Sequence, residues 1–290
     1  MSHPFVIMTD ISADMEPAAA EAADLRFIPM TYTLGSEERV CTHFEDDETL
    51  HRMYDGQRHG DLTRTTQVTP EMYKQQFSAL MKDGTDILCL CLSSGLSSTY
   101  ASACMAAEWM NEKYPEAHVR PVDSLSATVG MGLLLERAIA DRDAGMTLEE
   151  TAQDLEAARL GIAHWFMVDD LMYLKRGGRV SAATAVVGSA LNIKPILKID
   201  EQGALSTFAK KRGEKTAMAQ LVDYFRENRD DVPGRHVYVA HCDVPDRAEY
   251  LRREVLAIDP TCVVSVRQLS PIIGAHVGPG MCAIVHWGKR

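Results

Sequence analysis

The stretch DILCLCLSSG at residues 86–95 decides the fold class. Six consecutive apolar residues, Ile87 to Leu92, are followed directly by two serines and a glycine. Short apolar runs that end in small polar residues are typical of parallel strands buried on both faces, with the chain turning at their carboxyl ends. A helical pattern follows from Ser97 to Tyr114. The stretch therefore predicts a strand that leads into a helix.

The same order recurs on both sides of this stretch. The run FVIM at residues 5–8 ends in Thr9 and Asp10, and VRPV at 119–122 ends in Asp123 and Ser124. Helical patterns follow at 127–144 and 148–160. Strands that alternate with helices predict an α/β first half built on a parallel sheet.

The second half has a different pattern. Two runs at 193–199 and 204–209 flank DEQG, which predicts a hairpin. Gly177 and Gly178 are expected to stop a short helix at 170–175. Further strands are expected at 165–168, 236–241, 263–269 and 282–287, and helices at 214–228 and 246–258. We therefore predict two α/β lobes, with a parallel sheet in residues 1–161 and a mixed sheet in residues 162–290.

Composition excludes several classes of protein. The 290 residues are 46% hydrophobic and 24% charged, which is globular rather than disordered or collagen-like. Acidic residues outnumber basic ones by 41 to 30, so the net charge of −11 argues against a protein that coats nucleic acid. No apolar run is long enough to span a membrane, and the N-terminus lacks the basic region of a signal peptide. An odd count of 7 cysteines favours reduced thiols in a cytoplasmic protein.

Common catalytic and metal motifs are missing. Gly130-x-Gly132 is followed by Leu135 where a dinucleotide fingerprint needs a glycine, and it lies in a helical pattern. P-loop, HExxH and GxSxG sequences are absent. Cys89 and Cys91 point to one face of a strand, which leaves open a redox or metal protein, but no second pair stands at zinc spacing. We expect no metal and no cofactor.

Three polar clusters are candidates for a binding site. Ser94 and Ser97 precede a helix, whose amino terminus attracts carboxylates and phosphates, although both serines are also ordinary caps. Thr65 offers a neutral hydroxyl from a predicted loop. His276 stands among three glycines in GAHVGPG, which suggests a backbone that approaches a ligand, unless it is merely a loop histidine facing solvent.

A fourth cluster is basic. LKRGGR at 174–179 and KKR at 210–212 concentrate cations in an otherwise acidic chain. Such clusters either mark the docking site of an anion or acidic partner, or are solvated ends of helices.

Seven motifs in order resemble the DegV family of bacterial fatty-acid-binding proteins, across nearly the whole chain. Three departures from the family pattern are Ile11, Thr66 and Ser98. The motifs are TDISAD (9–14), TTQ (65–67), LSSGLSSTY (92–100), DS (123–124), LKRGGR (174–179), KPIL (194–197) and GAHVGPG (274–280).

The resemblance implies a two-lobed carrier without catalysis of its own. One long-chain fatty acid would lie in an apolar tunnel between the lobes, and a separate fatty acid kinase would phosphorylate its carboxylate for phospholipid synthesis. Neither nucleic acid nor more than transient membrane contact is expected. By analogy, the carboxylate would be held by Thr65, Ser97 (or Ser94) and His276, and the kinase would dock on Arg176, Arg179 and Arg212.

Two questions stay open at this point. A serine-type hydrolase using Ser97 and His276 is the alternative function, although only Asp10 and Asp123 stand at strand ends where an acid could orient the histidine. Four apolar residues either line the pocket or belong to ordinary core packing, namely Met15, Met30, Met131 and Phe166.

Overall fold

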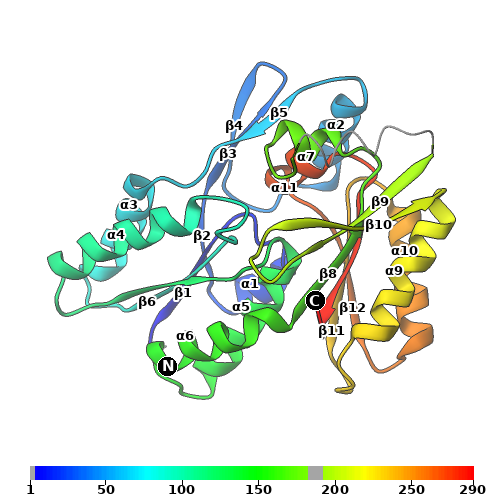
Figure 1. The fold of residues 1–290 in the computed structure, drawn as a ribbon. Coiled ribbons are helices and arrows are strands. Elements are labelled where there is room, and N and C mark those ends of the chain that lie inside the picture. Colours follow the sequence, from blue (N-terminus) through cyan, green and yellow to red (C-terminus); the bar gives the residue numbers. More distant parts are fainter. Residues whose placement is uncertain (1–3, 182–191) are drawn as a thin grey trace.

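The computed structural model describes residues 4–181 and 192–290 (Figure 1). Its first sheet is parallel, with strand order β2-β1-β6-β7, as the sequence predicts. The central strand β6 has no exposed residue, because helices cover both faces. The strands are β1 (Val6–Asp10), β2 (Arg26–Ile28), β6 (Ile87–Cys91) and β7 (Val119–Asp123).

The helices around this sheet start and stop close to the predicted positions. The α6 helix begins with a capping box, in which Thr147 and Glu150 satisfy each other's backbone N–H groups. The α3 helix is capped by the Thr69 side chain and starts at a proline. The helices are α1 (Pro17–Ala22), α3 (Pro70–Met81), α4 (Thr99–Lys113), α5 (Val129–Asp143), α6 (Leu148–Ala158) and the 3-10 turn η1 (Arg159–Gly161).

A small antiparallel sheet, ordered β4-β3-β5, was not predicted from the sequence. Its β5 strand has only three residues, too few for periodicity to reveal, whereas the two-residue turn Gly35-Ser36 between β3 and β4 is a recognisable hairpin signal. It matters for function because β5 ends at Thr65. The elements are β3 (Met30–Leu34), β4 (Glu37–Cys41), β5 (Thr63–Thr65) and the neighbouring helix α2 (Asp47–Arg58).

The second sheet has six strands in the order β10-β9-β8-β13-β11-β12. Only β11 and β12 are parallel, so the sheet is mixed, as predicted. All its strands follow residue 161, but the division into two domains there stays a prediction. The strands are β8 (Ile162–Met167), β9 (Ile193–Ile199), β10 (Leu205–Arg212), β11 (His236–His241), β12 (Val263–Gln268) and β13 (Cys282–Trp287).

The two faces of this sheet have different neighbours. Helices α9 (Glu214–Asn228) and α10 (Pro245–Ile258) cover one face and form a core of their own with it (Figure 1). Phe166 and Val285, on the other face, belong to the large core that includes the first sheet. This second face is turned toward the first lobe. Helices α7 (Met172–Arg176) and α11 (Pro271–Val277), which contact each other, lie on the same side.

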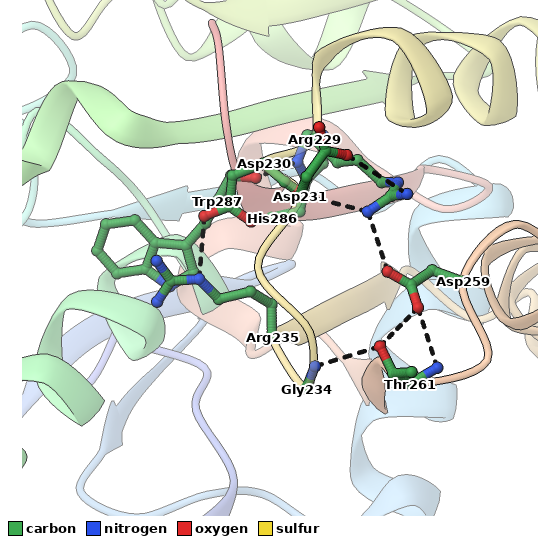
Figure 2. A network of polar contacts seen from close by, with 9 residues as sticks. All are labelled: Arg229, Asp230, Asp231, Gly234, Arg235, Asp259, Thr261, His286 and Trp287. Atoms are coloured by element: carbon green, nitrogen blue, oxygen red, sulfur yellow. Dashed lines mark hydrogen bonds and ion pairs between the residues drawn. The ribbon is translucent and has the colours of Figure 1, made fainter.

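Polar contacts join the segments that follow α9 and α10 to each other and to the end of β13 (Figure 2). Arg229, after α9, is 2.9 Å from a carboxylate oxygen of Asp259, after α10. The Asp230 N–H donates to the carbonyl of Trp287 at the end of β13. These contacts hold the outer helices to the sheet on the side away from the site.

Candidate ligand-binding site

A pocket lies between the two lobes, partly open to solvent, with a cavity volume of about 90 Å³. Its walls are mainly apolar and come from both lobes. Examples are Leu92 after β6, Phe166 on β8, Ile199 and Leu205 on the β9–β10 hairpin, and Ile272 on α11.

Two of the four proposed lining residues belong to the pocket wall. Met30 and Phe166 line it. Met15 and Met131 are fully buried in the hydrophobic core instead and are not among the lining residues. Apolar character alone does not distinguish these two outcomes, because core and pocket wall select the same side chains.

One end of the pocket is polar and is called the mouth here, comprising Thr65, Ser97, Arg179 and His276. A second recess adjoins it and shares three of these residues. The hydroxyl of Thr65 lies 2.8 Å from Nε2 of His276, although 211 positions separate them in sequence. The mouth thus brings together three of the four residues predicted to bind a carboxylate.

His276 lies on the last turn of α11, not on the glycine-rich loop that the sequence suggested. Burial, and then the nearby Arg179 guanidinium, lower its pKa to about 4, so it is neutral at pH 7. Within residues 4–181 and 192–290, its Nδ1 has no hydrogen-bond partner. A Cβ at Gly177 would stand 2.3 Å from this atom, so the ring position depends on that glycine.

The two candidate serines have different surroundings. Ser97 lines the mouth, and its hydroxyl is 2.9 Å from that of Thr99. Ser94 is exposed and outside the pocket lining, with its N–H bonded to Asp123. The N-cap position of α4 is Ser98, but it is the Ser97 hydroxyl that accepts a hydrogen bond from the N–H of Thr99, the first residue of the helix. The structure thus brings Ser97, but not Ser94, to the mouth.

The three candidate docking arginines also differ in position. Arg179 is half-buried at the mouth, where its Nε donates to the carbonyl of Leu96 and another nitrogen to that of Gly177. Burial lowers its pKa. Arg176 is exposed and lines the adjoining recess, and Arg212 is exposed at the end of β10. Docking by these residues stays a prediction.

Sequence reasoning missed several polar residues of the pocket. Gln67 and Thr128 line it, and so does His164 on β8. His164 had a recognisable signal, because it is the one polar residue in the buried strand IAHWFM. Thr128 had none, since its left-handed backbone angle, φ of 52°, is visible only in the structure.

The positions of these side chains give little support to the alternative functions, which are hydrolysis, redox chemistry and metal binding. Asp10 and Asp123 accept hydrogen bonds from backbone N–H groups of residues 12, 92, 94 and 125, and in the described part of the chain neither carboxylate is hydrogen-bonded to His276. The Cys89 and Cys91 sulfurs are 3.8 Å apart and fully buried. Within residues 4–181 and 192–290, no three His, Cys, Asp or Glu side chains form a group suited to a metal ion.

The fold and the pocket define an α/β protein with an apolar inter-lobe pocket and a polar, hydrogen-bonding mouth. Comparison with known proteins gives its family. The model of the "Uncharacterised protein, DegV family COG1307" matches residues 4–289. The chain belongs to the DegV family.

Curated relatives and solved structures agree. DegV domain-containing proteins of Streptococcus pyogenes and Lactococcus lactis are 36% and 35% identical, each covering 99% of this chain and 99% and 98% of the relative. A Thermus thermophilus family member described by its fatty acid binding superposes with a TM-score of 0.86 at 27% identity, covering 98% of this chain and 99% of the other. DegV of Bacillus subtilis, a fatty acid binding protein, superposes with a TM-score of 0.86 at 26% identity, covering 99% and 100%.

Proposed function

We propose that this protein binds one long-chain fatty acid in the inter-lobe pocket and presents its carboxylate to a separate fatty acid kinase. The observation that carries the proposal is the shape of one site: a mainly apolar pocket whose polar mouth contains Thr65, Ser97 and His276. Fatty acid binding by the Thermus and Bacillus relatives supports the same ligand.

The apolar wall accounts for affinity. Burying a methylene is worth about 0.8 kcal/mol, so a chain of about sixteen carbons gains on the order of 12 kcal/mol before ordering costs. Such a ligand requires no charge partner along its length. Its head group requires hydrogen bonds only at the mouth.

The uncharged groups of the mouth, Thr65, Ser97 and His276, suit a carboxylate that must later react. Hydroxyls and a neutral imidazole can donate to the carboxylate oxygens without leaving an unpaired buried cation when the pocket is empty. Arg179 also lies at the mouth, and two of its donors bond to the backbone carbonyls of Leu96 and Gly177. The carboxylate would thus be held by neutral donors, with the guanidinium beside it but engaged with the backbone, which leaves it nucleophilic toward a phosphoryl donor.

Presentation to a kinase rests on exposed cations beside the mouth. Arg176 lines the recess next to it, and no ion pair of Arg176 or Arg212 occurs among the described residues. Free cations on an acidic protein favour an acidic partner surface.

We place the protein in the cytoplasm, where its free cysteines would stay reduced. Within the described segments, no helix is long and apolar enough to cross a membrane.

Native mass spectrometry of the freshly purified protein, followed by solvent extraction, tests the proposal. The expected result is a stoichiometric mass excess of about 250–290 Da, matching acids of about 16–18 carbons, the size assumed for burial. Ser97→Ala should weaken retention of this lipid. A clean mass with no binding on titration would contradict the proposal. Turnover of esters by the wild type that Ser97→Ala abolishes would favour the hydrolase instead.

A further inference from the structure

A second polar group lines the pocket away from the mouth. His164 stands on β8, and its side chain faces the pocket with only 4% of the residue exposed. It makes no contact with Thr65, Ser97 or His276, so it has no part in the carboxylate site. A buried histidine in an otherwise apolar wall requires an explanation.

The strands show at which end His164 lies. Along β13, which follows the helix of His276, residues 281, 283 and 285 line the pocket in turn. Val285 is about 13 Å further along the strand than Met281, at 3.3 Å per residue. Val285 pairs with His164, whereas Ala283 pairs with Phe166. His164 is therefore at the end of the pocket remote from the mouth.

The imidazole is fixed in this position. Its Nε2 is 2.9 Å from the Ser126 hydroxyl and 3.3 Å from the Ala127 carbonyl. A Cβ at Gly130 would stand 2.1 Å from the same nitrogen, so the α5 backbone packs directly behind the ring. The ring cannot retreat in that direction when a ligand presses on it.

Next to the ring, the backbone is held in an unusual conformation. Thr128 lines the pocket at φ 52° and ψ −132°, a region that non-glycine residues rarely adopt, and Leu125 also has a positive φ. Burial lowers the pKa of His164 to about 3, which keeps the imidazole neutral. This end of the pocket is thus a rigid, uncharged wall.

We propose that His164, held by Ser126 and backed by Gly130, ends the acyl pocket and sets the longest chain the protein accepts. The inference rests on the proposed function, because it assumes that a fatty acid enters head group outermost. Each methylene that finds room raises affinity about fourfold. A methylene that meets the fixed ring gains nothing and must distort the wall, so affinity falls beyond the limit.

Titration with straight saturated acids of twelve to twenty carbons, read by native mass spectrometry, tests the inference. Wild-type affinity should rise about fourfold per methylene and then fall. His164→Ala should move this maximum at least two carbons toward longer chains. Gly130→Ala pushes the ring toward the pocket and should move the maximum toward shorter chains. His286→Ala is the matched control, because His286 is equally buried on the adjacent strand but packs against Phe225 on the opposite face.

The outcomes distinguish a failure of this inference from a failure of the proposed fatty acid binding. If wild type and both variants bind fatty acids with the same maximum, His164 is not the limit and the inference is overturned, while fatty acid binding stands. A shift of equal size in His286→Ala would also overturn it, because the effect would then be general destabilisation. If wild type binds none of the acids, the proposed function fails and the inference with it. Opposite shifts in the two pocket variants, with an unchanged control, support it.

Discussion

The hydroxyl of Ser93 donates to the carbonyl of Gly203 at 2.7 Å. This hydrogen bond joins the loop after β6 in the first lobe to the turn of the β9–β10 hairpin in the second. The fit is tight, since a Cβ at Gly203 would stand 2.1 Å from the Ser93 oxygen. Ile199 and Leu205, on the two sides of that turn, line the pocket. The hairpin therefore covers part of the pocket, and the Ser93–Gly203 hydrogen bond holds it in place.

Ser93→Ala should speed release of the bound lipid. Moving the hairpin away from the pocket breaks the Ser93–Gly203 bond, which is worth about 1 kcal/mol, or roughly a fivefold change in rate. Dissociation can be followed by transfer of a fluorescent fatty acid to excess albumin. Ser98→Ala is the control, because Ser98 is exposed nearby with no side-chain bond in the described structure. Equal release rates for both variants would show that the hairpin does not gate the pocket.

Thr65→Val should weaken fatty acid binding while leaving the fold intact. The change removes the hydroxyl that pairs with His276 and keeps the side-chain size. A hydrogen bond to a charged group contributes about 1.5–3 kcal/mol, so the dissociation constant should rise about 10- to 100-fold. Competitive displacement of a fluorescent fatty acid measures it. The control is Thr66→Val, because Thr66 is the exposed neighbour. If Thr66→Val weakens binding as much as Thr65→Val does, Thr65 has no specific role.

Charge reversal at the surface should separate binding from presentation. Arg176→Glu and Arg212→Glu change exposed side chains, so lipid content should be unchanged. Phosphorylation of the bound lipid by a fatty acid kinase should fall, because complementary charge promotes encounter. Arg253→Glu, exposed on α10, controls for net charge. Unchanged phosphorylation in both reversals would remove the docking assignment.

Much of the fold follows from local pattern. Buried parallel strands such as β6 are continuous apolar runs, and α6 has a complete capping box, so each is readable from neighbouring residues. In the small β4-β3-β5 sheet only the Gly35-Ser36 turn is readable in this way, because β5 has three residues and its place beside β3 depends on packing. The sequence also predicts a loop, not a helix, for His276. The glycines around it suggest a loop, yet Pro271 starts a helix that includes Gly274.

The site was harder to predict than the fold. Thr65, Ser97 and His276 share a mouth, but only the family resemblance linked them, since no local pattern joins positions 211 apart. Ser93 and Ser94 are adjacent, yet one fastens the hairpin and the other faces solvent. Position relative to the other lobe decides such differences, and a single sequence does not contain it.

Acid should destabilise the empty protein partly through His276. Its pKa is about 4 in the folded state and 6.5 ordinarily, so the unfolded chain binds more protons between these values. The stability that His276 contributes is complete above pH 6.5 and is lost as pH falls through 4, by at most about 1.4 kcal/mol per pH unit. Asp14 acts oppositely, because burial raises its pKa to about 7.

Comparison with His276→Gln isolates the histidine, since Asp14 and the other buried histidines are common to both proteins. Urea unfolding at several pH values between 7 and 4.5 should show that wild type loses more stability than the variant. A bound carboxylate favours the protonated imidazole, so fatty acid should reduce the difference. Parallel stability curves with and without lipid would mean that His276 does not titrate at the mouth, and that its part in holding the carboxylate is that of a neutral donor alone.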